Sequence, residues 1–141
     1  MLETNGNLWD FNGIHCVTTN GFIKKDGRAV MGKGCAKQAS LHYVNLPFIL
    51  GGRIKSEGNH VYYFSEFNVI TFPVKHAWYE PADPRLIVQS AHELMDLITK
   101  RNIIENIYLP RPGVGNGRLL WLDVKPLIEH VLSNQVIVVD F

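Results

Sequence analysis

Two glycine-rich stretches stand out in this sequence, because their residue types and spacing suit the binding of a phosphate. Gly32 and Gly34 lie in "VMGKGCAKQ", which leads into an expected helix, and three more glycines alternate between residues 113 and 117 in "LPRPGVGNGRLLW". Glycine lets the backbone turn sharply or approach another group closely. Unpaired N–H groups at a helix N-terminus attract phosphate oxygens. Two such loops facing each other predict a bound diphosphate, although glycine-rich turns alone are more often structural.

The common nucleotide-binding and hydrolase motifs are not met. The first stretch has Lys37 where the dinucleotide fingerprint requires a third glycine, and neither stretch matches the GxxxxGK[ST] P-loop. The sequence has no GxSxG nucleophile motif, no HExxH metal motif and no His/Cys pair at ligand spacing. We therefore expect no metal, no cofactor, and no serine or cysteine hydrolase chemistry.

The composition is that of an ordinary globular protein, and we expect one domain over residues 1–141. Hydrophobic residues make up 46% of the chain and charged residues 19%, which excludes an intrinsically disordered segment. The formal net charge of +1 argues against a strongly basic nucleic-acid binder. Lys24, Lys25, Arg28 and Lys33 nevertheless form a local basic cluster.

The cysteines and the N-terminus favour a cytoplasmic location. Cys16 and Cys35 lie among apolar or small residues without CxxC spacing, which is typical of free thiols in a reducing compartment. The first residues lack the basic start and apolar stretch of a signal peptide. No apolar run approaches the ~20 residues that a membrane-spanning helix needs.

Strands and amphipathic helices alternate along the chain, which predicts an α/β sheet covered on both faces. We expect strands at 13–20, 60–67, 68–74, 106–110 and 135–141, with the second and third paired as a hairpin, and helices at 35–45, 83–100 and 122–134. Asp83 is a suitable N-cap and Pro84 suits the first turn of the longest helix. Because ligands bind at the carboxyl ends of strands in such folds, the loops after Asn20 and before Arg118 should open on one rim.

The combination of "VTTN", "VMGKGCAKQA", "FPVKHAW" and "LPRPGVGNGRLLW" resembles the macrodomain family of ADP-ribose binders. Within that family the chain is similar to the branch of DarG-type antitoxins, which remove ADP-ribose from DNA, and to related phage-encoded proteins. The resemblance extends from "GNLWDF" at 6–11 to the terminal strand. It implies a three-layer α/β/α fold with a mixed, roughly six-stranded central sheet.

The resemblance also implies which residues hold ADP-ribose. The two glycine loops would grip the diphosphate and distal ribose, Asn7 and Leu8 would face the adenine, and Asn20 would contact the ribose hydroxyls. From their chemistry alone, Asn7 is equally a turn former and Asn20 a cap at the end of its strand. The full implied set is Asn7, Leu8, Asn20, Met31, Gly32, Lys33, Gly34, Cys35, Gly113, Val114, Gly115, Asn116, Gly117, Arg118 and Phe141.

Catalysis would fall to Lys75, with Asn20 beside it, because Lys75 matches the catalytic lysine of the DNA-deconjugating branch. A lysine of depressed pKa in a desolvated site can attack as a nucleophile or stabilise departing charge, although a lysine after a strand is normally a solvated surface residue. His76 is either a proton shuttle or a surface histidine. Gly117 stands where another branch has an acidic residue, and "FIKKDGRA" lengthens the loop after Asn20. That basic insert suits a nucleic-acid or nucleotide phosphate, or is a solvated run of charge.

Three functions share the predicted pocket. The first is an ADP-ribosyl glycohydrolase, with DNA as one conjugate and protein or a small metabolite as others. The second is a non-catalytic reader of ADP-ribose or a related nucleotide, and the third a phosphatase of ADP-ribose 1″-phosphate. The sequence favours the enzyme. The resemblance implies a bacterial or phage source, a cytoplasmic location (the host's if phage-encoded), a toxin as a further partner, and no membrane association.

Overall fold

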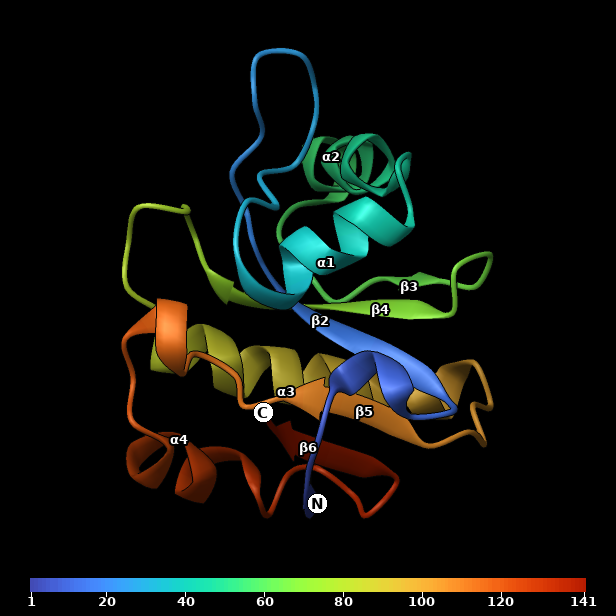
Figure 1. The fold of residues 1–141 in the computed structure, drawn as a ribbon, viewed down its shortest axis with the longest axis vertical. Helices are drawn as coiled ribbons and strands as arrows, with labels where there is room; N and C mark the ends of the chain where they lie inside the picture. Colours follow the sequence, from blue (N-terminus) through green and yellow to red (C-terminus); the bar gives the residue numbers. More distant parts are fainter.

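One mixed six-stranded sheet forms the centre of the computed structural model, which describes residues 1–141 (Figure 1). The strand order is β1-β6-β5-β2-β4-β3, and every pair is parallel except the antiparallel β3 and β4. The strands are β1 (Leu2–Asn5), β2 (Ile14–Asn20), β3 (Tyr63–Phe64), β4 (Val69–Lys75), β5 (Ile107–Pro110) and β6 (Val136–Asp140). The helices are η1 (Leu8–Asp10), α1 (Gly34–His42), α2 (Leu46–Glu57), α3 (Pro84–Lys100), η2 (Gly115–Gly117) and α4 (Trp121–Ile128).

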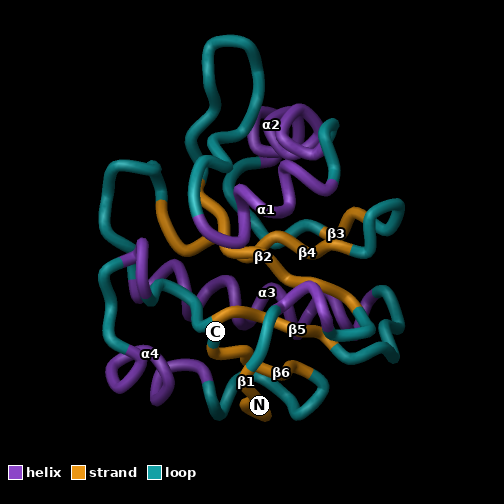
Figure 2. Tube along the Cα trace, viewed as in Figure 1, coloured by secondary structure: helices purple, strands orange, loops and turns teal.

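The sheet is covered on both faces, as the sequence predicts. One core joins its first face to α3 and α4, and a second core joins the opposite face to η1, α1 and α2 (Figure 2). Successive strand residues enter opposite cores: Cys16 belongs to the first and Val17 to the second, each 0% exposed. The expected three-layer α/β/α arrangement is confirmed. No helix in the structure has the length and hydrophobicity to cross a bilayer.

Several predicted elements are present with shorter bounds. The strand expected at 60–67 is regular only at Tyr63–Phe64, although its hairpin with β4 is present. The helix expected at 122–134 runs instead from Trp121 to Ile128. Pro126 lies inside that helix and offers no N–H to the preceding turn, and the helix ends two residues later.

Two elements are absent from the sequence-based prediction. The strand β1 is a short edge strand with mostly exposed residues, so its sequence shows no apolar alternation. The helix α2 contains Gly51 and Gly52, which read as loop residues. Gly51 has a packing reason: a Cβ there would lie 2.0 Å from the carbonyl oxygen of Gly27. The loop between β2 and α1 therefore packs directly on α2.

Candidate functional site

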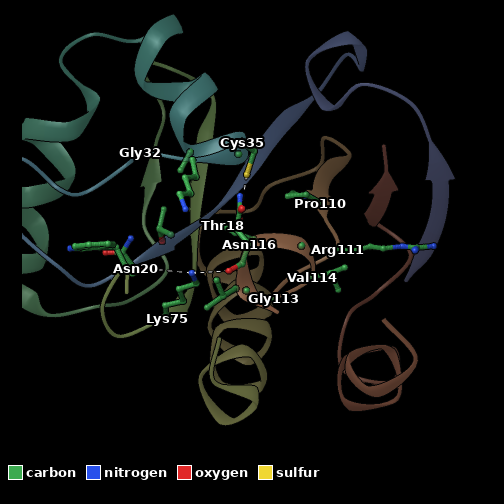
Figure 3. Close-up of a pocket in the computed structure, with 18 of the residues that line it drawn as sticks. Thr18, Asn20, Gly32, Cys35, Lys75, Pro110, Arg111, Gly113, Val114 and Asn116 are labelled. Carbon is green, nitrogen blue, oxygen red and sulfur yellow. Dashed lines mark hydrogen bonds between the residues drawn. The ribbon is translucent and has the colours of Figure 1, made fainter. Parts of the chain in front are cut away.

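A cleft of about 370 Å³ opens at the carboxyl ends of β2, β4, β5 and β6, between the two glycine loops (Figure 3). Because these four strands are parallel, the loops that follow them share one rim, as the sequence predicts. The predicted residues that line the cleft are Asn20, Gly32, Lys33, Gly34, Cys35, Lys75, Gly113, Val114, Gly115, Asn116, Gly117 and Phe141. Figure 3 shows Asn20 and Lys75 toward one end and Pro110 and Arg111 toward the other.

Four predicted residues lie outside this cleft. Asn7 and Leu8 border a second hollow of about 220 Å³, which shares Phe141 with the cleft. Leu8 is 1% exposed and belongs to the core. Met31 is likewise buried among core residues, and Arg118 is exposed beyond the cleft wall.

Asn7 has the structural role that its chemistry allowed. Its Oδ1 accepts a hydrogen bond from the Trp9 backbone N–H at 3.0 Å and so caps η1. That oxygen therefore already has a partner at the position where the resemblance implied adenine recognition. The hollow beside it shares Phe141 with the cleft, so the two lie next to each other.

The glycines of the two loops serve different purposes. A Cβ at Gly113 would lie 2.7 Å from Ile87 Cδ1, and one at Gly117 would lie 2.9 Å from Ala82 Cβ. These two glycines therefore let the loop pack against the protein's own side chains. A Cβ at Gly32 or Gly115 would meet no atom within 4 Å. Only these last two leave bare backbone facing open space on the cleft wall.

The two loops approach each other across the cleft. Gly34 has a φ of +59°, and a Cβ there would lie 3.2 Å from the side-chain nitrogen of Asn116. Gly34 begins α1, so the unpaired N–H groups of that helix's first turn lie at this wall. The arrangement is the facing pair of loops that the sequence predicts for a diphosphate.

Lys75 ends β4 inside the cleft and contacts the second loop. Its Nζ donates hydrogen bonds to the carbonyl oxygens of Asn116 at 3.0 Å and Trp78 at 3.4 Å. Partial burial lowers the pKa of Lys75 below that of an ordinary lysine, and the positive charges of Arg118 and Lys33 lower it further. Lys75 is therefore not a freely solvated surface lysine, and it also holds the 113–117 loop in place.

Asn20 lies opposite Lys75, because a shift in the β2–β4 register between Thr19 and Asn20 aligns the two ends. Its Nδ2 donates to the Val30 carbonyl at 3.1 Å, and its Oδ1 accepts from the Phe22 N–H at 2.9 Å. The side chain therefore closes both ends of the loop between β2 and α1. This is the capping role that its chemistry allowed, and one N–H of its amide remains for a ligand.

His76 points to a surface carboxylate. Its Nε2 lies 2.8 Å from Asp83 Oδ2, and the Asp83 Oδ1 accepts from the Arg85 N–H to cap α3. The hydrogen bond with His76 lowers the pKa of Asp83. The structure thus gives His76 the surface role, since it does not line the cleft.

Sequence reasoning missed other cleft residues, which lie at strand ends or beside the predicted loops. They are Thr18, Thr19, Val30, Ala36, Val74, Trp78, Pro110, Arg111, Val139 and Asp140. The signal that could have found most of them is position, since they lie at the carboxyl ends of β2, β4, β5 and β6.

Charge at the cleft favours an anionic ligand. Arg111 and Asp140 pair at 3.4 Å, so the one acidic side chain on the cleft wall already has a cationic partner. Lys33 and Lys75 lie on the wall without an acidic partner. Burial raises the pKa of the Cys35 thiol, which lies 3.3 Å from Thr18 Oγ1, so Cys35 contributes a neutral wall. No group of three or more metal-ligating side chains is present.

No protein-family model matches the chain, and no curated protein matches it in sequence. Solved structures do match its fold. The macrodomain of Thermus aquaticus DarG superposes with a TM-score of 0.80 at 24% identity, covering 98% of this chain and 95% of that one. The macrodomain of Mycobacterium tuberculosis DarG gives 0.79 at 23%, covering 99% and 97%. Thermosipho africanus DarTG in complex with ADP-ribose gives 0.79 at 19%, covering 98% of this chain and 41% of that one. The chain therefore has the macrodomain fold.

Proposed function

We propose that this chain binds ADP-ribose in the cleft and hydrolyses an ADP-ribosyl linkage. One observation carries the proposal: the open backbone of Gly32 and Gly115 faces a single cleft that also contains Lys75. Bare backbone and unpaired cations suit a diphosphate, and the adjoining hollow at Asn7 and Phe141 gives the ligand room to extend. A structural neighbour, Thermosipho africanus DarTG, is in complex with ADP-ribose, which supports the same ligand here.

Hydrolysis would break the glycosidic bond at C1″ of the distal ribose. Water adds its hydroxyl to that carbon, and its proton passes to the leaving group. The Lys75 ammonium, held by the carbonyls of Trp78 and Asn116, would stabilise the charge that develops on the departing atom. No acidic side chain in the second loop offers an alternative, since Gly117 occupies that position and lies against Ala82.

The test combines binding and release with two substitutions of Lys75. Calorimetry measures ADP-ribose affinity, and chromatography measures ADP-ribose released from modified DNA, modified protein and ADP-ribose 1″-phosphate. Lys75→Ala should keep binding and lose release. Lys75→Gln keeps N–H donors for the Asn116 carbonyl but removes the charge, so it separates loss of charge from loss of the loop contact.

The resemblance of the sequence favours DNA as the conjugate, and release from the protein or phosphate conjugate alone would reassign the substrate. A reader module is the second function. Wild-type protein that binds ADP-ribose tightly yet releases nothing from any conjugate would establish it. The specific observation in its favour is that Lys75 already has a structural role in holding Asn116.

A further inference from the structure

Three exposed aromatic side chains form a ledge at the mouth of the cleft. Phe22, Trp78 and Tyr79 are 38%, 53% and 61% exposed, and we call them the aromatic ledge. The ring centroids of Trp78 and Tyr79 lie 5.4 Å apart, and those of Phe22 and Tyr79 lie 6.2 Å apart. Trp78 also lines the cleft, and its carbonyl accepts from Lys75. The ledge therefore begins where the cleft ends, beside the lysine assigned to catalysis.

The ledge is built from two segments that hold each other in place. The Gly21 N–H donates to the His76 carbonyl at 3.2 Å, which ties the loop after β2 to the loop after β4. The loop after β2 is a narrow hairpin over residues 21–30, closed by a bridge between Ile23 and Ala29. The Ala29 N–H donates to the Pro47 carbonyl at 2.8 Å and so fixes the hairpin on α2. Figure 1 shows the hairpin projecting beyond the sheet beside α2.

The hairpin carries positive charge that the protein leaves unpaired. Arg28 pairs with Asp26 at 2.7 Å, whereas Lys24 and Lys25 are exposed and have no ion-pair partner. On the facing loop, Asp83 pairs with His76, and Glu80 is exposed without an ion-pair partner. Contiguous exposed apolar groups often mark an interaction site, and here the hairpin that supplies Phe22 also carries two lysines without an ion-pair partner, so the surface points to a partner.

We infer that the aromatic ledge and the lysines of the hairpin bind single-stranded nucleic acid flanking the modified nucleotide. Bases have two open faces that stack on exposed aromatic rings, and the backbone phosphates between them are attracted to Lys24 and Lys25. The inference rests on the proposed function for what occupies the cleft. It goes beyond that function because the ledge would bind an unmodified strand by itself.

Fluorescence anisotropy with labelled oligothymidylate and oligouridylate of about ten nucleotides tests this surface. Tyr79→Ala should weaken binding of either strand about 5- to 150-fold, since one stacked base is lost. Replacing Lys24 and Lys25 together by Gln should make the dependence of log K on log salt shallower by about 1.4, at about 0.7 per lysine. Neither substitution touches the cleft wall, and thermal unfolding should be unchanged.

Matched substitutions elsewhere serve as controls. Lys55→Gln with Lys100→Gln removes two exposed lysines away from the ledge, and Ile104→Ala removes an apolar side chain that is 89% exposed. Both should leave strand binding as in wild type. Controls that weaken binding as much as the ledge variants, or a duplex that binds as tightly as the single strand, would overturn the inference.

Calorimetry with free ADP-ribose keeps the two proposals separate. The Tyr79 and lysine variants should bind free ADP-ribose as wild type does. If the wild-type protein binds ADP-ribose but neither oligonucleotide, the nucleic-acid role of the aromatic ledge is wrong and the proposed function is unaffected. If the protein binds the oligonucleotides but not ADP-ribose, the proposed function is wrong and the nucleic-acid role of the aromatic ledge is unaffected.

Discussion

Substitution of Gly32 and Gly113 by alanine should separate the glycine that faces a ligand from the glycine that only permits packing. At Gly32 the new methyl group meets no atom within 4 Å, and the backbone is not in the left-handed region. Alanine at such a site restricts the unfolded chain and should stabilise the protein by about 0.4–1 kcal/mol. Gly32 also lines the cleft, so we expect the added methyl group to weaken ADP-ribose binding at least about tenfold, or ~1.4 kcal/mol.

At Gly113, in contrast, alanine should destabilise the fold. The residue has a φ of +78°, which costs alanine about 1–2 kcal/mol. The methyl group would also lie 2.7 Å from Ile87 and 2.9 Å from Leu119, an overpacking that typically costs about 1–3 kcal/mol. The free energy of unfolding should therefore fall by roughly 2–5 kcal/mol. For a chain of this size the melting temperature would fall by roughly 6–20 °C.

Thermal denaturation and calorimetric titration of ADP-ribose measure both effects. Gly52→Ala is the control, because Gly52 lies in α2 away from the cleft and its added methyl group also meets open space. It should stabilise the fold and leave affinity unchanged. If Gly32→Ala binds ADP-ribose as wild type does, the open wall is not where the ligand lies, and the reasoning fails.

Three further substitutions test the electrostatics and the core. Arg118→Gln removes a cation that lowers the pKa of Lys75; that pKa should rise, and the alkaline limb of kcat/KM should move to higher pH. Ser90→Ala removes the 2.7 Å hydrogen bond from the buried Ser90 hydroxyl to the Pro73 carbonyl and should cost about 1–3 kcal/mol in chemical denaturation. Leu94→Ala deletes a side chain that is 0% exposed between α3 and the sheet and should cost about 2–5 kcal/mol in the same assay.

Elements whose bounds depend on their own residues, such as their periodicity and capping residues, were predictable from the sequence. The helix α3 begins at Pro84 after the Asp83 cap and ends at Lys100, as its periodicity and capping residues predict. The helix α2 was missed because the need for Gly51 arises from a different segment, the hairpin that packs on it. Because the contact that requires Gly51 comes from a distant segment, the sequence around Gly51 shows only a glycine, which is typical of a loop.

The same distinction applies to the candidate site. Its location was predictable, because parallel strands bring their carboxyl ends to one rim. The sequence could not show which glycines of the second loop permit packing and which face open space. The clash that a side chain at Gly113 would make with Ile87 depends on how α3 lies against the sheet. The hydrogen bond from Asn20 to the Val30 carbonyl was not predictable either, because Val30 lies ten residues away and the sequence does not indicate that a hairpin brings the two together.

The ligand itself should change the state of Lys75, and this yields a test of its role. In the unliganded cleft, desolvation together with Arg118 and Lys33 lowers the pKa of Lys75. A bound diphosphate adds negative charge to the same cleft, which favours the ammonium and raises that pKa again. A nucleophilic amine would thus be disfavoured by its own substrate, whereas a charge-stabilising ammonium would be favoured.

If the ammonium is the active form, activity is lost as pH rises through the pKa of Lys75. The kcat/KM profile reports the free enzyme and the kcat profile the complex, so the alkaline limb of kcat should lie at the higher pH. Initial rates measured across the alkaline range at limiting and saturating substrate give both limbs. Activity that instead increases with pH through this range would show that the neutral amine acts, and Lys75 would then be the nucleophile despite the charge of the bound diphosphate.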